Sequence, residues 1–171
     1  MTTTADTICD ELATALSVID FDTTWGVDIP FEIQTQSLPD FDLVEAVDAA
    51  QIRIAAFPNT ESRRVDRATI ETDHKVGIAI VKKLTITDGV VDGTEFRQLK
   101  LMAESIRDWC WTALMSTYGL KVIRVDFPAW FDMERAKNGV FLTVIQPVFR
   151  LGSDAVLMLA INPDPPTPGL E

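Results

Sequence analysis

Few residues of this chain have the types and spacing that catalysis requires. The single histidine, His74, follows Asp73 at the beginning of an alternating stretch, and Asp126, Asp132 and Glu134 lie near one another in sequence. A histidine beside a carboxylate can act as a general acid or base. A lone histidine is far more often a surface residue or a satisfied core residue, and the three acids have no second cluster to act with. We therefore interpret all of these residues as structural.

Motifs that mark nucleophiles or phosphate sites are also missing from the sequence. It contains no glycine-rich phosphate loop, no Gly-x-Ser-x-Gly, no His-Glu-x-x-His and no Cys-x-x-Cys. Cys9 and Cys110 each fall on the apolar side of an expected helix, which favours buried free thiols over a disulfide or a catalytic thiol. We expect a protein that is not an enzyme and that needs no cofactor.

Two similar acidic segments, at residues 19–22 and 39–42, are candidates for a metal-binding loop. Both place aspartates on either side of a phenylalanine. Neither has the glycine and the distal glutamate that a helix-loop-helix calcium site requires. We therefore expect no metal site.

The charge is distributed unevenly along the chain. The net charge is −11, from 15 basic and 26 acidic residues, and the first basic residue is Arg53. A field of one sign disfavours phosphate binding by residues 1–52 and suits a basic protein partner, a surface to which DNA does not adhere, or simple solubility. The acids that we assign to a face that repels DNA or meets a partner are Asp20, Asp22, Asp28, Glu32, Asp40 and Asp42.

One amphipathic helix over residues 96–118 organises the rest of the chain. Thr94 suits its N-cap, and Gly119 suits its end. An earlier helix is expected over residues 4–18. The apolar stripe of the main helix is Phe96, Leu99, Ala103, Ile106, Cys110, Ala113 and Thr117.

Alternating apolar residues predict strands at 31–35, 50–57, 73–84, 120–128 and 140–151. Pro58 is expected to end the second strand, and Pro147 indicates that the last strand is at an edge or bulged. The connection over residues 59–68 carries Arg63, Arg64 and Arg67. We expect the strands on either side of it to form a long projecting hairpin with these arginines at its tip.

Together these elements predict an α+β fold, with a mainly antiparallel sheet and two helices packed on one face. The other face of the sheet is left for something else to cover. Residues 1–161 form a single domain in this interpretation. Residues 162–171 contain four prolines, which favours an extended or disordered tail.

The hairpin also resembles a known family. Ile52-Arg53-Ile54-Ala55-Ala56-Phe57-Pro58, the arginine-bearing connection, and Asp73-His74-Lys75-Val76-Gly77-Ile78-Ala79-Ile80-Val81-Lys82-Lys83 resemble the hairpin of tail terminator and related neck proteins of long-tailed bacteriophages. The helix and the two strands that follow match the same layout, so the resemblance covers about residues 1–150. The proline-rich end and the acid-only first third depart from it.

The resemblance implies a structural protein of the virion, assembled in the host cytoplasm. Such proteins form a ring, usually of six subunits, that caps the tail tube, stops its polymerisation and joins it to the head connector, while DNA passes through without specific binding. Another head-tail joining component, a head-closure or tail-completion protein, is the nearest alternative. A small enzyme or ligand-binding module of unknown chemistry is the alternative from a different class.

A ring requires surfaces at which subunits meet. A projecting hairpin can add its strands to the sheet of a neighbour. We therefore expect the hairpin and the basic or aromatic residues near it to contact the next subunit or another partner. The residues that we assign to this contact are Arg53, Arg63, Arg64, Arg67, Lys82, Lys83, Trp130 and Phe131.

Overall fold

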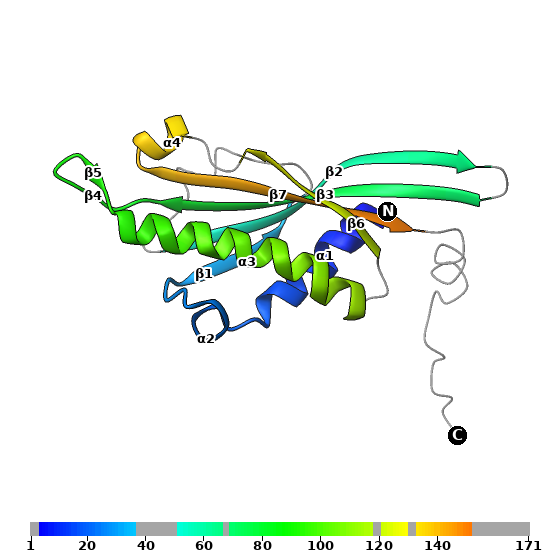
Figure 1. Ribbon diagram of the computed structural model, residues 1–171, viewed down its shortest axis with the longest axis horizontal. Helices are drawn as coiled ribbons and strands as arrows, with labels where there is room; N and C mark the ends of the chain where they lie inside the picture. Colours follow the sequence, from blue (N-terminus) through cyan, green and yellow to red (C-terminus); the bar gives the residue numbers. More distant parts are fainter. Residues whose placement is uncertain (1–3, 37–50, 67–68, 118–120, 130–132, 152–171) are drawn as a thin grey trace, which may run out of the picture.

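The computed structural model describes residues 4–36, 51–66, 69–117, 121–129 and 133–151 (Figure 1). The domain boundary expected at residue 161 and the proline-rich tail lie outside these ranges. The elements in chain order are α1 (Thr4–Ser17), α2 (Phe21–Trp25), β1 (Phe31–Thr35), β2 (Ile52–Asp66), β3 (Thr69–Lys83), β4 (Ile86–Thr87), β5 (Val90–Val91), α3 (Gly93–Thr117), β6 (Lys121–Ala129), α4 (Met133–Lys137) and β7 (Val140–Leu151).

Five strands form one sheet in the order β1-β2-β3-β7-β6. β2 with β3, β3 with β7, and β6 with β7 are antiparallel, whereas β1 runs parallel to β2. β4 and β5 form a separate small hairpin. The predicted α+β class with a mainly antiparallel sheet is therefore confirmed.

The main core lies between the sheet and the two long helices, α1 and α3, which share one face of it (Figure 1). Helical spacing on α1 and α3 and alternation on the strands turn the apolar side chains toward each other. The fully buried members include Leu12 and Leu16 of α1, Leu99, Met102 and Ile106 of α3, and Ile54, Ile78 and Ile145 of the sheet.

Side chains on the opposite face of the sheet are buried as well. Ala55, Phe57 and Ala79 form a second small cluster, with exposed fractions of 3% or less. The ring of Phe57 lies over Gly77, its partner across the β2–β3 pair, so that a Cβ at residue 77 would overlap the ring. This face is therefore not an open apolar surface in the described residues.

The expectation that β2 ends at Pro58 is wrong. β2 continues to Asp66, with a shift in pairing between Pro58 and Thr60. A bulge at this point accommodates a proline, which has no N–H to donate to the ladder. Residues 59–66, expected as a loop, therefore extend the strand.

Of the two alternatives predicted from Pro147, the edge position is wrong, because β7 lies between β3 and β6, whereas the pairing around the proline is locally irregular. The β3–β7 pairing passes from Lys75 opposite Val148 to Ile78 opposite Ile145, without pairs at the proline. An interior strand can hold a proline at this position because the ladder is locally interrupted there.

The sequence did not predict the short helices α2 and α4 or the β4–β5 hairpin. Asp20 caps the beginning of α2, because its side chain accepts a hydrogen bond from the Thr23 backbone nitrogen at 3.2 Å, and Gly26, with φ of 67°, caps its end. α3 begins earlier than expected. The carboxylate of Asp92, and not the hydroxyl of Thr94, caps it by accepting from the Thr94 nitrogen at 2.8 Å.

Candidate assembly interface

The most prominent feature of the sheet is its two-stranded end. We define the arm as residues 60–66 of β2 paired with residues 69–75 of β3. Figure 1 shows the tip of the arm extending beyond the helices. Among the described residues, β7 follows β3 as far as Leu151, opposite Thr72, so only residues 69–71 and their partners in β2 lie beyond it as two strands.

The outer edge of β2 is covered by β1 only near its beginning. β1 pairs with residues 52–56 of β2, and the Gln36 nitrogen donates one further bond to the Ala56 carbonyl at 2.8 Å. Among the described residues, no strand follows β2 beyond this point on that side. An edge of this kind carries backbone N–H and C=O groups that another strand can pair with.

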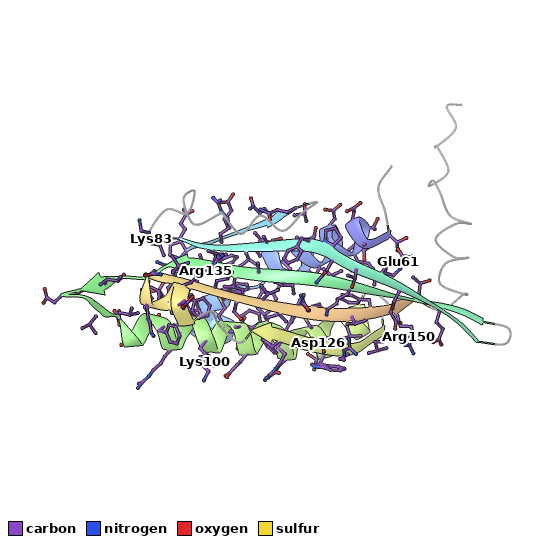
Figure 2. The ribbon with its side chains drawn as sticks, turned by 90° about the horizontal axis from the view of Figure 1, so that it is seen from above. Glu61, Lys83, Lys100, Asp126, Arg135 and Arg150 are labelled. Carbon is purple, nitrogen blue, oxygen red and sulfur yellow. The ribbon has the colours of Figure 1, made fainter. Side chains whose placement is uncertain are left out.

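A network of charges holds the base of the arm to the rest of the sheet. Arg150 of β7 donates to both carboxylate oxygens of Asp73, at 2.7 Å and 2.9 Å, and lies 3.2 Å from a carboxylate oxygen of Glu71. The hydrogen bond to Asp73 is the main cause of the raised pKa of Arg150. Figure 2 shows Arg150 and Glu61 at the end of the sheet from which the arm extends. The base of the arm is thus fixed in direction by a bidentate pair.

His74 lies at the base of the arm, and it is neither exposed nor satisfied. It is 4% exposed, and its Nδ1 atom is buried without a hydrogen-bond partner. The nearest carboxylate oxygen of Glu61, opposite it on β2, is 3.8 Å away. Burial lowers the pKa of the imidazole, while Glu61 and Asp73 act in the opposite direction more weakly. His74 is therefore a neutral, buried side chain at neutral pH.

We expect this histidine to make the folded state sensitive to mild acid. Because its pKa is lower in the folded than in the unfolded chain, the unfolded chain binds more protons once the pH falls below the ordinary histidine pKa of about 6.5. Its contribution to stability is complete above that pH and is lost as the pH falls further. Urea unfolding between about pH 7.5 and about pH 5.5 should show a declining free energy of unfolding.

The chain has no other histidine, so its imidazole can be followed directly by NMR during the same titration. His74→Gln is the matched control, since it keeps a polar side chain but has no titrating group in this range. A flat pH profile in the wild type, or the same decline in the variant, would show that His74 is not responsible.

The structure separates the basic residues that the sequence assigned to one contact. Arg63 and Arg64 lie in the arm, at positions opposite Thr72 and Glu71. Arg53 lies 3.5 Å from Glu32 of β1 and so joins two strands of its own sheet. Arg67, Trp130 and Phe131 lie outside the described residues.

Lys82 is not available for an exposed contact, contrary to our assignment. It lies on the helix-covered face with an exposed fraction of 2%, and its Nζ is 3.0 Å from a carboxylate oxygen of Glu95 in α3. Strand alternation explains the error, since Lys82 shares the face of Ile78 and Ile80. Lys83 is exposed, and Figure 2 places it far from Arg150, toward the other end of the sheet.

The acidic residues have varied environments. Asp20 caps α2, and hydrogen bonds from the Thr23 hydroxyl and then the Thr23 backbone lower its pKa. Asp22 and Asp28 are exposed, and Glu32 is paired with Arg53 as described. Asp40 and Asp42 lie outside the described residues.

Of the acids considered for catalysis, the two that the structure describes are not paired with His74. Asp126 contacts Lys75 at 3.6 Å and Arg124 at 2.8 Å, and Glu134 lies in the first turn of α4. Asp132 lies outside the described residues. The described members of this set therefore belong to ion pairs or to a helix start.

Both cysteines are buried free thiols, as predicted. Burial raises the pKa of Cys9 and that of Cys110 to about 12, and Asp6 and Asp10 add to the effect at Cys9. Thiols with such a high pKa are poor nucleophiles near neutral pH.

Sequence analysis missed a groove between α1 and the edge strand β1. It has a volume of about 470 Å³. The groove could not be located without the strand order. β1 is an edge strand, so one of its sides has no described strand beside it, and the groove lies there next to α1. We name it the α1–β1 groove, and it is lined by Asp10, Ala13, Thr14, Ser17, Ile33, Gln34 and Thr35.

Two further properties concern only the described part of the chain. No group of three or more histidine, cysteine, aspartate or glutamate side chains there is arranged to hold a metal ion. None of the helices described is both long and apolar enough to cross a membrane.

No protein-family model matches the sequence, and comparison with curated proteins finds no match.

Proposed function

We propose that this protein is a structural ring subunit of the neck or tail of a long-tailed bacteriophage, acting as a tail terminator. In this role it caps the tail tube, stops its polymerisation and presents a surface to the head connector. The resemblance of residues 52–83 to the hairpin of such proteins supports the proposal. In this proposal the protein acts through contacts between subunits and not by catalysing a reaction.

The observation that carries the proposal is the arm. Its β2 edge has no described partner beyond Ala56, and its base is held by the Arg150–Asp73 pair. A strand held in a fixed direction loses little further conformational entropy when it pairs with a neighbour. The arm is therefore suited to joining copies of the chain.

The acidic first third fits the same role in one of two ways. Residues 1–52 contain no lysine or arginine. Like charge at a lumen would let DNA pass without forming phosphate contacts. The same charge could instead meet a basic surface of the neighbouring subunit.

Sedimentation and negative-stain imaging of the purified full chain test the proposal. A closed ring, with six copies as the expected number, would support it. A monomer at about 100 μM, far above the dissociation constants of about 1 μM or less that stable assemblies show, would contradict it. Mixing with purified tail-tube and connector proteins then distinguishes the roles: a terminator binds and stops the growing tube, whereas a head-closure protein binds only the connector.

Removing positive charge from the arm should weaken assembly more than folding. We expect Arg63→Glu combined with Arg64→Gln to lower the association constant at least about tenfold, or about 1.4 kcal/mol, with a change in unfolding free energy within about 0.5 kcal/mol. Glutamine is chosen at residue 64 because this position faces Glu71 across the pair, where a new acid would repel. Sedimentation and thermal melting measure the two effects.

The matched control is Arg97→Glu combined with Lys100→Gln on α3. Both of these residues are exposed, and the change in charge is the same. Equal weakening in both double variants would indicate a general charge effect. Unchanged assembly in the arm variant would remove these arginines from the contact.

A further inference from the structure

We propose that two copies of this chain pair through the outer edges of their arms, with β2 of one copy antiparallel to β2 of the other and Ser62 on the twofold axis between them. The inference goes beyond the proposed function, because it specifies which edge meets which edge and in what register. A pair of this symmetry does not close into a ring, so the ring proposed above needs one further contact in each subunit.

The backbone of β2 turns its hydrogen-bonding groups outward at alternate residues. At the covered end of the strand, the Ile52 nitrogen donates to the Pro30 carbonyl, and the Ala56 carbonyl accepts from the Gln36 nitrogen, each at 2.8 Å. The even-numbered residues of this part of β2 therefore present their backbone groups to the outer edge, and the odd-numbered residues present theirs to β3.

Beyond the bulge the odd-numbered residues take the outward direction. Pro58 pairs with Val76 and Thr60 pairs with Lys75, so β2 has one residue more than β3 at this point. The extra residue reverses the alternation relative to the numbering. Backbone groups at positions 61, 63 and 65 therefore point to the outer edge, where no described strand pairs with them.

A twofold axis at Ser62 satisfies these outward groups. It places Glu61 of each copy opposite Arg63 of the partner subunit, and both positions direct their backbone groups outward. Antiparallel pairs of this type exchange two backbone hydrogen bonds each. Ser62 then lies opposite Ser62 of the partner subunit, in a pair of the other type, whose Cα atoms are about 4.5 Å apart.

The distribution of charge along the arm favours a second copy as the partner. The arm contains four acids and three bases, so it does not favour a partner surface of one sign. Within β2, however, positions 61 and 63 share a face, and an antiparallel copy brings the acid of each strand opposite the base of the other. The Glu61 side chain is 56% exposed. An axis at residue 63 would instead place Arg63 opposite Arg63 of the partner subunit, which is unfavourable.

The length of the uncovered edge fits the same register. β1 covers β2 as far as Ala56. With the axis at Ser62, Asp66 at the end of β2 lies opposite Pro58 of the partner subunit, so the pairing stops before the covered part begins. An axis at residue 61 would place Asp66 opposite Ala56 of the partner subunit, whose carbonyl already accepts a hydrogen bond from Gln36. The edge that β1 leaves uncovered is thus long enough for one arm.

Disulfide formation on the axis tests the inference. Ser62 is exposed, and Ser62→Cys would place two thiols on residues whose Cα atoms are about 4.5 Å apart, within the range of about 4.4 to 6.8 Å found in disulfides. We expect a covalent dimer of the full chain under mild oxidation, seen on a non-reducing gel. The native thiols do not compete, because both are buried.

Thr60→Cys is the matched control for this experiment. Thr60 is also exposed and lies on the same face of β2, two residues from the axis. Its distance from the same residue of the other copy would be about 14 Å, too far for a disulfide. This variant should remain uncross-linked under the same conditions.

Two charge reversals give an independent measurement. Glu61→Arg and Arg63→Glu each place like charges opposite one another at two symmetric positions, so each should weaken association at least about tenfold in sedimentation. An equimolar mixture of the two variants should associate as the wild type does, because each variant then meets the complementary charge in the other. Thermal melting of each variant checks that the fold is intact.

The outcomes separate this inference from the proposed function. A covalent dimer from Ser62→Cys alone, with association restored in the mixture, supports the inference. Equal cross-linking of both cysteine variants, no cross-linking of either, or a mixture as weak as its components overturns it. Closed rings without the cross-link at residue 62 leave the proposed function intact, whereas cross-linked pairs in a chain that forms no ring contradict the proposed function alone.

Discussion

Ile106→Asp is expected to prevent the subunit from folding. Ile106 lies in the middle of α3 with an exposed fraction of 0%, within the cluster that joins α3 to the sheet. An aspartate there removes apolar contacts and places a carboxyl group where no partner was provided. We expect a loss of at least about 4 kcal/mol, a large part of the 5 to 15 kcal/mol typical of a domain.

Circular dichroism and urea unfolding measure this effect, and Leu101→Asp on the same helix is its control. Leu101 is 48% exposed, so the same new residue remains in contact with water and should change the unfolding free energy by less than about 1 kcal/mol. If both variants melted like the wild type, Ile106 would not be buried between α3 and the sheet.

Gly77→Ala should have the second largest effect on folding. A methyl group at this position would overlap the ring of Phe57, which has an exposed fraction of only 3% and little room to move. Overpacking of this kind costs about 1 to 3 kcal/mol. The measurement is the midpoint of urea unfolding at constant m-value.

Two further variants show whether the ring of Phe57 is the cause. Gly93→Ala makes the same chemical change at the first residue of α3, where a Cβ meets nothing within 4 Å, so it should be neutral or stabilising by up to about 1 kcal/mol. Phe57→Ala should destabilise alone, but should remove most of the additional cost of Gly77→Ala. Additive effects in the double variant would rule out the overlap.

The two long helices could be located from the amino-acid sequence because helical periodicity is a local property. α1 was expected over residues 4–18 and spans Thr4–Ser17, and α3 was expected over 96–118 and spans Gly93–Thr117. Buried members of the predicted stripe, such as Leu99 and Ile106, do lie in the core. The α+β class followed from the number and order of such segments.

Strand ends were less predictable because pairing can override local signals. Pro58 is a strong local stop, but β3 continues beside it, and one shift in register lets β2 proceed to Asp66. His74 has the sequence context of a surface residue, but strand alternation turns it to the helix-covered face, where it is buried. Lys82 is turned inward in the same way and is matched there by Glu95, thirteen positions later in the chain.

The order of the residues alone reveals the charge asymmetry, the absence of motifs for catalysis, and the apolar faces of the two long helices. The order of the residues does not reveal the continuation of β2 beyond Pro58, the edge position of β1 or the groove beside α1. They depend on which strands pair and in what order, and those pairings join residues such as Phe31 and Ile52 or Asp73 and Arg150. Contacts between residues so distant in the chain leave no periodic signal in the sequence, and only the folded chain brings them together.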